Sequence, residues 1–228
     1  MGGPPPVSAL IPAATMVTAA IYMVARCGPI FAESQFALDT ITTLGLIGAI
    51  LTATMACAQY DMKRILAYST ISQLAFMFVA LGCGAPKSGV FHVFTHAWFK
   101  ALLFLGAGSV MHAMGGVIDV RRFSGLRSVL PHTYRVMLIG GLALAGFPLL
   151  AGFWSKDEIV HAAFDRSPLV GGLLLATAGL TAYYTFLAVG LGGLFFVILQ
   201  HLVRAGWPIA VRRLAENAMI TLPLLCLL

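Results

Sequence analysis

The fold is decided by the stretch SGVFHVFTHAWFKALLFLGAGSVMHAM, which occupies positions 88–114. Most of its residues are apolar, yet its middle contains three titratable side chains, His92, His96 and Lys100. About 20 apolar residues in a helix cross the roughly 30 Å hydrocarbon core of a bilayer. The stretch therefore predicts a membrane-spanning helix that carries ionisable groups inside the membrane.

The composition of the whole chain agrees with a membrane protein. Of the 228 residues, 60% are hydrophobic and 10% are charged, whereas about 25% are charged in a typical soluble domain. The mean hydropathy is +0.94. A backbone in lipid must satisfy its own hydrogen bonds, and the chain has no period-two strand pattern. We therefore predict an all-α membrane protein, a multi-span helical bundle with six or seven spans, at 5–25, 40–58, 65–82, 88–114, 136–163, 169–203 and, shorter, 219–228.

The basic residues predict how the chain is oriented in the membrane. The net charge of +6 does not indicate a nucleic-acid partner, because the basic residues fall in the loops between spans. If six spans alternate, nine loop cations lie on one side and three on the other. The positive-inside rule then places the start of the first span on the cytoplasmic side. The nine are Lys63, Arg64, Arg121, Arg122, Arg127, Arg135, Arg204, Arg212 and Arg213, and the three are Arg26, Lys87 and Arg166.

The fifth predicted span is interrupted at about residues 146–152. Gly146, Pro148 and Gly152 fall within its apolar run, and proline removes a backbone donor and clashes with the preceding turn. One interpretation is a simple kink. The other is a discontinuous helix whose freed backbone groups line a wet cavity, as in transporters. The charged residues Lys156 and Asp157, which follow the interruption and are expected near the non-cytoplasmic end of the span, favour the second interpretation.

The spacing of His92, His96 and Lys100 places all three on one stripe of a helix, which rises roughly 12 Å from first to last. Lys100 lies near the bilayer midplane, where a lysine costs about 2.5 to 3.5 kcal/mol and should face the bundle interior. Burial favours the neutral form of an amine, and histidine titrates near neutrality, so the stripe could pass protons.

Several other interpretations of these residues stay open. Each histidine could donate to a neighbouring carbonyl while Lys100 pairs with a carboxylate, although three titratable groups on one stripe favour function. A zinc site is less consistent with the sequence, because the H-E-x-x-H glutamate is absent and Lys100 would repel the metal. Lys156 and Asp157 fit either an interfacial charge cluster or a proton exit. The four cysteines are too scattered for a metal site or a disulfide framework.

Four segments of the chain resemble a known family. They are PVSAL with AATMV at 6–17, KRILAYSTISQ at 63–73, HVFTHAWFKALLF at 92–104 and GFWSKDEI at 152–159. They look like the antiporter-like membrane subunits of proton-pumping NADH:quinone oxidoreductase, respiratory complex I. The SKDE sequence is most similar to the largest and most distal subunit, called chain L or chain 5. The resemblance covers about residues 2–186.

This resemblance implies a function for the buried stripe. In that family the positions of His92, His96 and Lys100 form part of a central hydrophilic axis, and the position of Asp157 lies on the route to the non-cytoplasmic side. Lys156 is expected to modulate the pKa of Asp157. No cofactor is expected here, since electron transfer occurs in other subunits. The expected partners are the other membrane subunits of complex I and the lipid bilayer, in a bacterial inner membrane.

The chain departs from the family in two places and begins unlike a whole subunit. Pro12 stands where the family has a histidine, so one relay station is replaced by a helix kink. Residues 187–228 form an apolar and basic tail without resemblance, which leaves 1–186 as a partial antiporter-like domain of five to six spans. Residues 1–4 look like the loop before the family's second half, so we expect a fragment that holds the second half of a proton path.

The leading hypothesis is thus a proton-translocating subunit of complex I, a translocase component without a redox site of its own. A close alternative is the large subunit of a multisubunit sodium/proton antiporter or of a membrane-bound hydrogenase, since these share the same segments. An alternative of another class is a structural membrane scaffold without ion transport.

Overall fold

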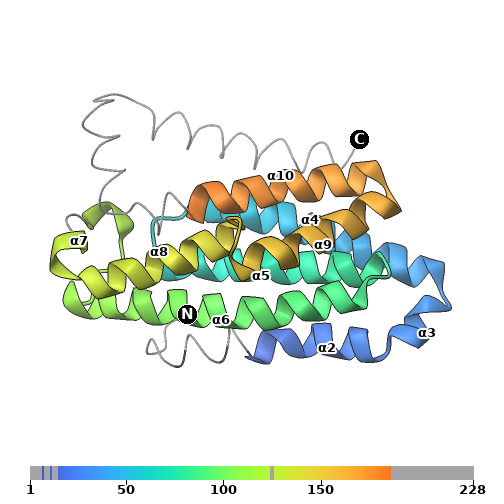
Figure 1. Ribbon diagram of the computed structural model, residues 1–228, viewed down its shortest axis with the longest axis horizontal. Helices are drawn as coiled ribbons and strands as arrows, with labels where there is room; N and C mark the ends of the chain where they lie inside the picture. Colours follow the sequence, from blue (N-terminus) through green and yellow to red (C-terminus); the bar gives the residue numbers. More distant parts are fainter. Residues whose placement is uncertain (1–6, 8–10, 12–14, 124–125, 186–228) are drawn as a thin grey trace.

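The computed structural model describes residues 7, 11, 15–123 and 126–185, with side chains as far as residue 182. This part of the chain is helical apart from turns and one antiparallel backbone bridge between Asp61 and Asp119. Figure 1 shows the long helices lying side by side in a bundle. The prediction of an all-α bundle is confirmed. The expectations for Pro12 and for residues 187–228 fall outside the described residues.

Three described helices are long and apolar enough to cross a membrane, namely α4, α5 and α6. They match the predicted spans at 40–58, 65–82 and 88–114, whereas the total of six or seven spans stays a prediction. The elements are η2 Met16–Thr18, α2 Ala19–Arg26, α3 Gly28–Ala32, α4 Gln35–Cys57, α5 Met62–Gly82, α6 Pro86–Ala113, η3 Val120–Arg122, α7 Leu126–Val129, α8 Pro131–Ala145, α9 Ala151–Arg166 and α10 Pro168–Thr185.

Helix α5 lies between α4 and α6, and small residues bring α4 and α5 close together (Figure 1). A Cβ added at Gly82 would lie 2.2 Å from Thr42 Oγ1, and one added at Gly45 would lie 3.1 Å from the Ala75 carbonyl oxygen. Small residues permit this approach in membranes, where helix association depends on van der Waals packing. The central position of α5 lets its side chains reach both α6 and α9.

The predicted interruption of the fifth span is a complete break between α8 and α9. Helix α8 ends at Ala145, and Gly146 adopts a left-handed conformation with φ 83°. The Phe147 N–H donates to the Leu142 carbonyl at 3.0 Å, and the Gly146 N–H donates to the Ala143 carbonyl at 3.2 Å. These two bonds form a Schellman motif, which glycine favours because it lacks a Cβ. The discontinuous helix is therefore confirmed, and the simple kink is excluded.

Gly152 does not lie in the break itself, which differs from the prediction. It belongs to the first turn of α9, and a Cβ placed on it would lie 1.8 Å from the Ala143 carbonyl oxygen of α8. The two half-helices therefore touch backbone to backbone at this residue. Gly152 fixes the distance between α8 and α9 on which the neighbouring polar contacts depend.

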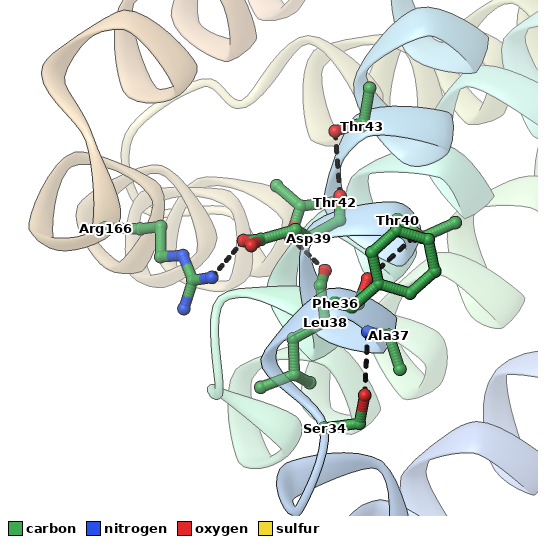
Figure 2. A network of polar contacts seen from close by, with 9 residues as sticks. All are labelled: Ser34, Phe36, Ala37, Leu38, Asp39, Thr40, Thr42, Thr43 and Arg166. Carbon is green, nitrogen blue, oxygen red and sulfur yellow. Dashed lines mark hydrogen bonds and ion pairs between the residues drawn. The ribbon is translucent and has the colours of Figure 1, made fainter.

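The far end of α9 is tied to the beginning of α4 by an ion pair. The Arg166 guanidinium donates to a carboxylate oxygen of Asp39, as Figure 2 shows. Arg166 lies in the last turn of α9, where a cation is favoured by the helix dipole. Ser34 caps α4 in the same region by accepting from the Ala37 N–H at 3.4 Å. Helix α9 is thereby held at both of its ends.

At the opposite end of the bundle, the loop after α6 is joined to the turn between α4 and α5. The Met62 N–H donates to the Ile118 carbonyl at 3.0 Å, and the Val120 N–H donates to the Tyr60 carbonyl at 2.9 Å. The Arg121 guanidinium lies 4.1 Å from the centre of the Tyr60 ring and donates to Asp119 at 2.6 Å. These hydrogen bonds from Arg121 lower the pKa of Asp119 to about 2.

We expect this loop contact to weaken in acid. The pKa of Asp119 in the folded chain is depressed to about 2. Its contribution to the stability of the loop contact is therefore fully present above the ordinary aspartate pKa of about 3.9 and is lost as the pH falls through about 2. The protection of the Val120 and Met62 amides against hydrogen exchange, relative to the intrinsic rate at each pH, should therefore fall between about pH 4 and pH 2. In an Arg121→Ala variant the loss of protection should begin at higher pH, and equal profiles for both proteins would contradict the assignment.

Candidate functional site

His92, His96 and Lys100 lie on one face of α6, and each is 0% exposed. Residues of α5 and α9 hydrogen-bond the side chains on this face, and α8 also packs against α6, so the stripe points into the bundle. Apolar packing joins α5 and α9, because Phe76 and Val79 of α5 share a buried cluster with Ile159 of α9. The titratable groups thus lie in the interior of the bundle.

His92 is hydrogen-bonded through both ring nitrogens. Its Nδ1 lies 2.8 Å from the Ser155 hydroxyl of α9, and its Nε2 lies 3.1 Å from the side-chain oxygen of Gln73 of α5. The Thr95 hydroxyl also donates to Ser155, at 3.0 Å. His92 therefore connects α5, α6 and α9 at one buried point.

The Lys100 ammonium is held by uncharged oxygen atoms of α5. It donates to the Ser69 hydroxyl and to the Leu66 carbonyl, the latter at 3.3 Å. The Ser69 hydroxyl in turn donates to the same carbonyl at 3.0 Å. Among the ion pairs of the described residues, none joins Lys100 to a carboxylate.

His96 lies between the two groups just described. Its ring centroid is 6.1 Å from that of His92 and 5.3 Å from that of Phe99, whose ring it meets edge-on. Within the described part of the chain neither ring nitrogen of His96 has a hydrogen-bond partner. The stripe thus continues from His92 to Lys100 through an imidazole that is free to accept or donate.

The break between α8 and α9 supplies the partner of Lys156. Helix α8 ends before residue 148, and proline at that position has no N–H to offer the Leu144 carbonyl. The Lys156 ammonium, 5% exposed, donates to this carbonyl instead. Lys156 therefore lies beside the break in the bundle interior, not near the end of the span as expected.

Asp157 lies apart from the buried stripe. Successive helical residues are about 100° apart around the axis, so the neighbour of buried Lys156 points elsewhere. Asp157 is exposed and lines an open pocket whose wall carries three carboxylates. The structure thus brings His92, His96, Lys100 and Lys156 together and leaves Asp157 outside. The pocket is lined by Ser88, Asp157, Glu158, His161, Ala162 and Asp165.

The residues described in the structure include no cluster of three His, Cys, Asp or Glu side chains that could hold a metal ion. Cys27, Cys57 and Cys83 are free thiols. The site is therefore built from two amines, two imidazoles and uncharged oxygen atoms. Such a set can accept, hold and release protons, because each group has a neutral and a protonated form.

Sequence reasoning did not single out Ser69, Gln73, Thr95 and Ser155. All four are buried. Ser69, Gln73 and Ser155 hydrogen-bond the titratable side chains, and Thr95 hydrogen-bonds Ser155. A signal for them existed, since a polar side chain within an apolar span is costly to bury without a partner. Ser69 and Gln73 are also four residues apart, on the face of α5 that the stripe would have to meet.

Comparison with known proteins agrees with this architecture. The family described as NADH:quinone oxidoreductase/Mrp antiporter, TM, matches residues 1–181. Subunit 5 of the NAD(P)H-quinone oxidoreductase of the Paulinella chromatophora chromatophore is 51% identical over 194 residues, covering 82% of this chain and 29% of its own. NADH-ubiquinone oxidoreductase chain 5 of Arabidopsis thaliana is 50% identical over 190 residues, covering 82% and 28%. The chain thus spans less than a third of these relatives.

Solved structures show the same fold. The Mrp complex from Dietzia sp. matches 82% of this chain and 22% of its own, with 32% identity and a TM-score of 0.75. The archaeal membrane-bound sulfane sulfur reductase matches 95% of this chain and 50% of its own with a TM-score of 0.76, and at 24% identity it supports the fold alone. The resemblance found in the sequence is confirmed. The chain is an integral membrane protein that belongs to the NADH:quinone oxidoreductase/Mrp antiporter transmembrane family and is similar to its chain 5 members.

Proposed function

We propose that this chain is part of a proton-translocating membrane subunit of an NAD(P)H-quinone oxidoreductase, in which His92, His96, Lys100, Lys156 and Asp157 carry the protons. One observation supports this most. Lys100 and Lys156 are buried, at 0% and 5% exposure. Within the described residues both amines donate hydrogen bonds only to uncharged oxygen atoms. Buried groups of this kind are costly in a membrane and are kept for function.

The absence of a carboxylate beside either amine, among the residues that the structure describes, matters for the chemistry. A salt bridge would hold a lysine permanently charged, whereas a carbonyl or hydroxyl oxygen supports the ammonium less strongly. Each amine can then gain or lose its proton as its neighbours change charge. Lys156 would be affected by a proton on His92, His96 or Lys100, because like charges repel in a medium of low dielectric constant.

Asp157 fits the last step of such a path. It is exposed beside the buried Lys156, on a face that also carries Glu158, His161 and Asp165. A proton leaving Lys156 would pass to this face and exchange with water there. Electron transfer would occur in other subunits, which would be the partners of this chain.

The second candidate is an ion-translocating subunit of an Mrp-type antiporter. The observation that favours it is the likeness to the Mrp complex from Dietzia sp. at 32% identity. A structural scaffold without transport is the third. It would need no buried amines and predicts that their removal changes nothing but packing.

The test uses membrane vesicles that contain the assembled oxidoreductase, with this chain and its partner subunits, and follows proton uptake driven by NADH with a pH-sensitive dye. Lys156→Ala should lower the rate at least about tenfold, since a positioned proton-transfer group contributes 10² to 10⁴ in rate. Lys87→Ala, at an exposed position of α6, should pump like the parent protein. Uptake without NADH that depends on a sodium gradient would favour the antiporter, and parental uptake by Lys156→Ala would refute the relay.

A further inference from the structure

Ser155 occupies a position where its hydroxyl has two alternative acceptors. The side chain is fully buried in α9, one residue before Lys156. Its Oγ lies 2.8 Å from His92 Nδ1 and 3.1 Å from the Ala151 carbonyl oxygen. A serine hydroxyl has one hydrogen, so it can donate to only one of these groups at a time.

The other ring nitrogen of His92 determines at which atom the ring gains or loses a proton. Nε2 faces the side-chain oxygen of Gln73 at 3.1 Å, and an amide oxygen can only accept. Nε2 therefore carries a hydrogen in both charge states of the ring. A proton that arrives at or leaves His92 must consequently bind at Nδ1, which is the atom that faces Ser155.

We propose that the Ser155 hydroxyl is a hydrogen-bond switch that follows the charge of His92, and this rests on the proposed proton path. When the ring is neutral, Ser155 donates to Nδ1. When the ring is protonated, Nδ1–H donates to Ser155, and the hydroxyl turns to donate to the Ala151 carbonyl. No O–H bond of serine breaks in this change, because the hydroxyl keeps its own hydrogen and only rotates about the Cβ–Oγ bond.

The surrounding groups accommodate both positions. Thr95 donates to Ser155 Oγ at 3.0 Å and lies 3.2 Å from the His92 carbonyl oxygen, so it retains an acceptor in either case. The titratable neighbours are His96 and Lys100 on α6 and Lys156 on α9, and α5 faces His92 with the uncharged Gln73.

The switch would link α6 to the broken helix. Ala151 is the first residue of α9, directly after the break, and Lys156 follows Ser155 in the same helix. Protonation of His92 would thus add a hydrogen bond in the first turn of α9, close to the contact between Lys156 and the Leu144 carbonyl. Ser155 acts here as a positioning residue, since the proton itself stays on the imidazole.

The experiment is ¹⁵N nuclear magnetic resonance of the histidine rings in the complete chain, reconstituted in lipid vesicles. The His92 signals are assigned by subtracting the spectrum of His92→Gln. When the parent ring is neutral, it should carry its hydrogen on Nε2. The ¹⁵N chemical shift of Nδ1 should then be that of a nitrogen that accepts a hydrogen bond. In Ser155→Ala the Nδ1 chemical shift should move to that of a nitrogen without a hydrogen-bond donor. In Ser155→Thr, which keeps a hydroxyl, it should stay at the parental value.

Proton uptake driven by NADH is measured for the same variants in membrane vesicles that contain the assembled oxidoreductase with all of its subunits. We expect a loss of roughly tenfold for Ser155→Ala and recovery to within about twofold for Ser155→Thr. A neutral parent ring with its hydrogen on Nδ1 would overturn the proposal, whether or not the variants fold. So would an unchanged Nδ1 signal in Ser155→Ala. If the parent showed no uptake while Ser155→Ala lost its Nδ1 shift, the proposed function would fail and the switch would stand.

Discussion

Replacing Lys100 by methionine is expected to abolish proton translocation by the complete chain while leaving its assembly in the membrane intact. Methionine has a similar length and no charge, so it fills the space between α5 and α6 without an amine. Removing a lysine near the midplane relieves about 2.5 to 3.5 kcal/mol of insertion cost. The hydrogen bonds that Lys100 donates to the Ser69 hydroxyl and the Leu66 carbonyl contribute about 1.5 to 3 kcal/mol each at most. The two effects offset each other, so stability should change little.

The rate of NADH-driven proton uptake in vesicles should nevertheless fall at least about tenfold. Lys100→Ala should show the same loss of uptake, and Lys100→Arg should not restore it, because an arginine does not release its proton in proteins. Lys87→Ala controls for the loss of a lysine from α6 at an exposed position. Normal pumping by a correctly assembled Lys100→Met protein would show that this amine carries no protons.

The second large effect is expected from Gly152→Ala. Its new Cβ would lie 1.8 Å from the Ala143 carbonyl oxygen, which belongs to a backbone and cannot turn aside as a flexible side chain could. Helices α8 and α9 would have to separate, and the contact between Lys156 and the Leu144 carbonyl would be strained with them. Overpacking typically costs about 1 to 3 kcal/mol, and a backbone clash belongs at or above the upper end of that range.

Thermal unfolding of the purified complete chain in detergent measures this cost. Gly172→Ala in α10 is the matched control, since nothing lies within 4 Å of its added Cβ. Alanine is the better helix former by about 1 kcal/mol, so the control should unfold at the parental temperature or above it. Equal melting temperatures for the two variants would contradict the close approach at Gly152.

The long helices were predictable because their signal is local. The apolar runs at 40–58, 65–82 and 88–114 became α4, α5 and α6, and the first two of these helices begin some residues earlier than expected. Their starts are set by polar caps, Ser34 and Asp61, whose side chains accept from backbone N–H groups. Hydropathy does not detect such residues, so the predicted boundaries were too short.

The buried stripe was also a local pattern, since spacings of four follow the turn of a helix. Its hydrogen-bond partners could not be predicted from a local pattern, because Ser155 lies 63 residues from His92 and Ser69 lies 31 residues from Lys100 along the chain. Such pairs depend on which helices pack together. Asp157 shows the opposite error, since its closeness to Lys156 in sequence suggested a shared environment that the turn of α9 removes.

The break between α8 and α9 has a consequence for anyone who redesigns this protein. Pro148 and Lys156 act together. Pro148 has no N–H to donate to the Leu144 carbonyl, and the Lys156 ammonium donates to that carbonyl instead. Grafting the lysine into an unbroken helix would make it compete with the backbone for the same oxygen. The cation and the interruption must therefore be transplanted together, in the same register, or not at all.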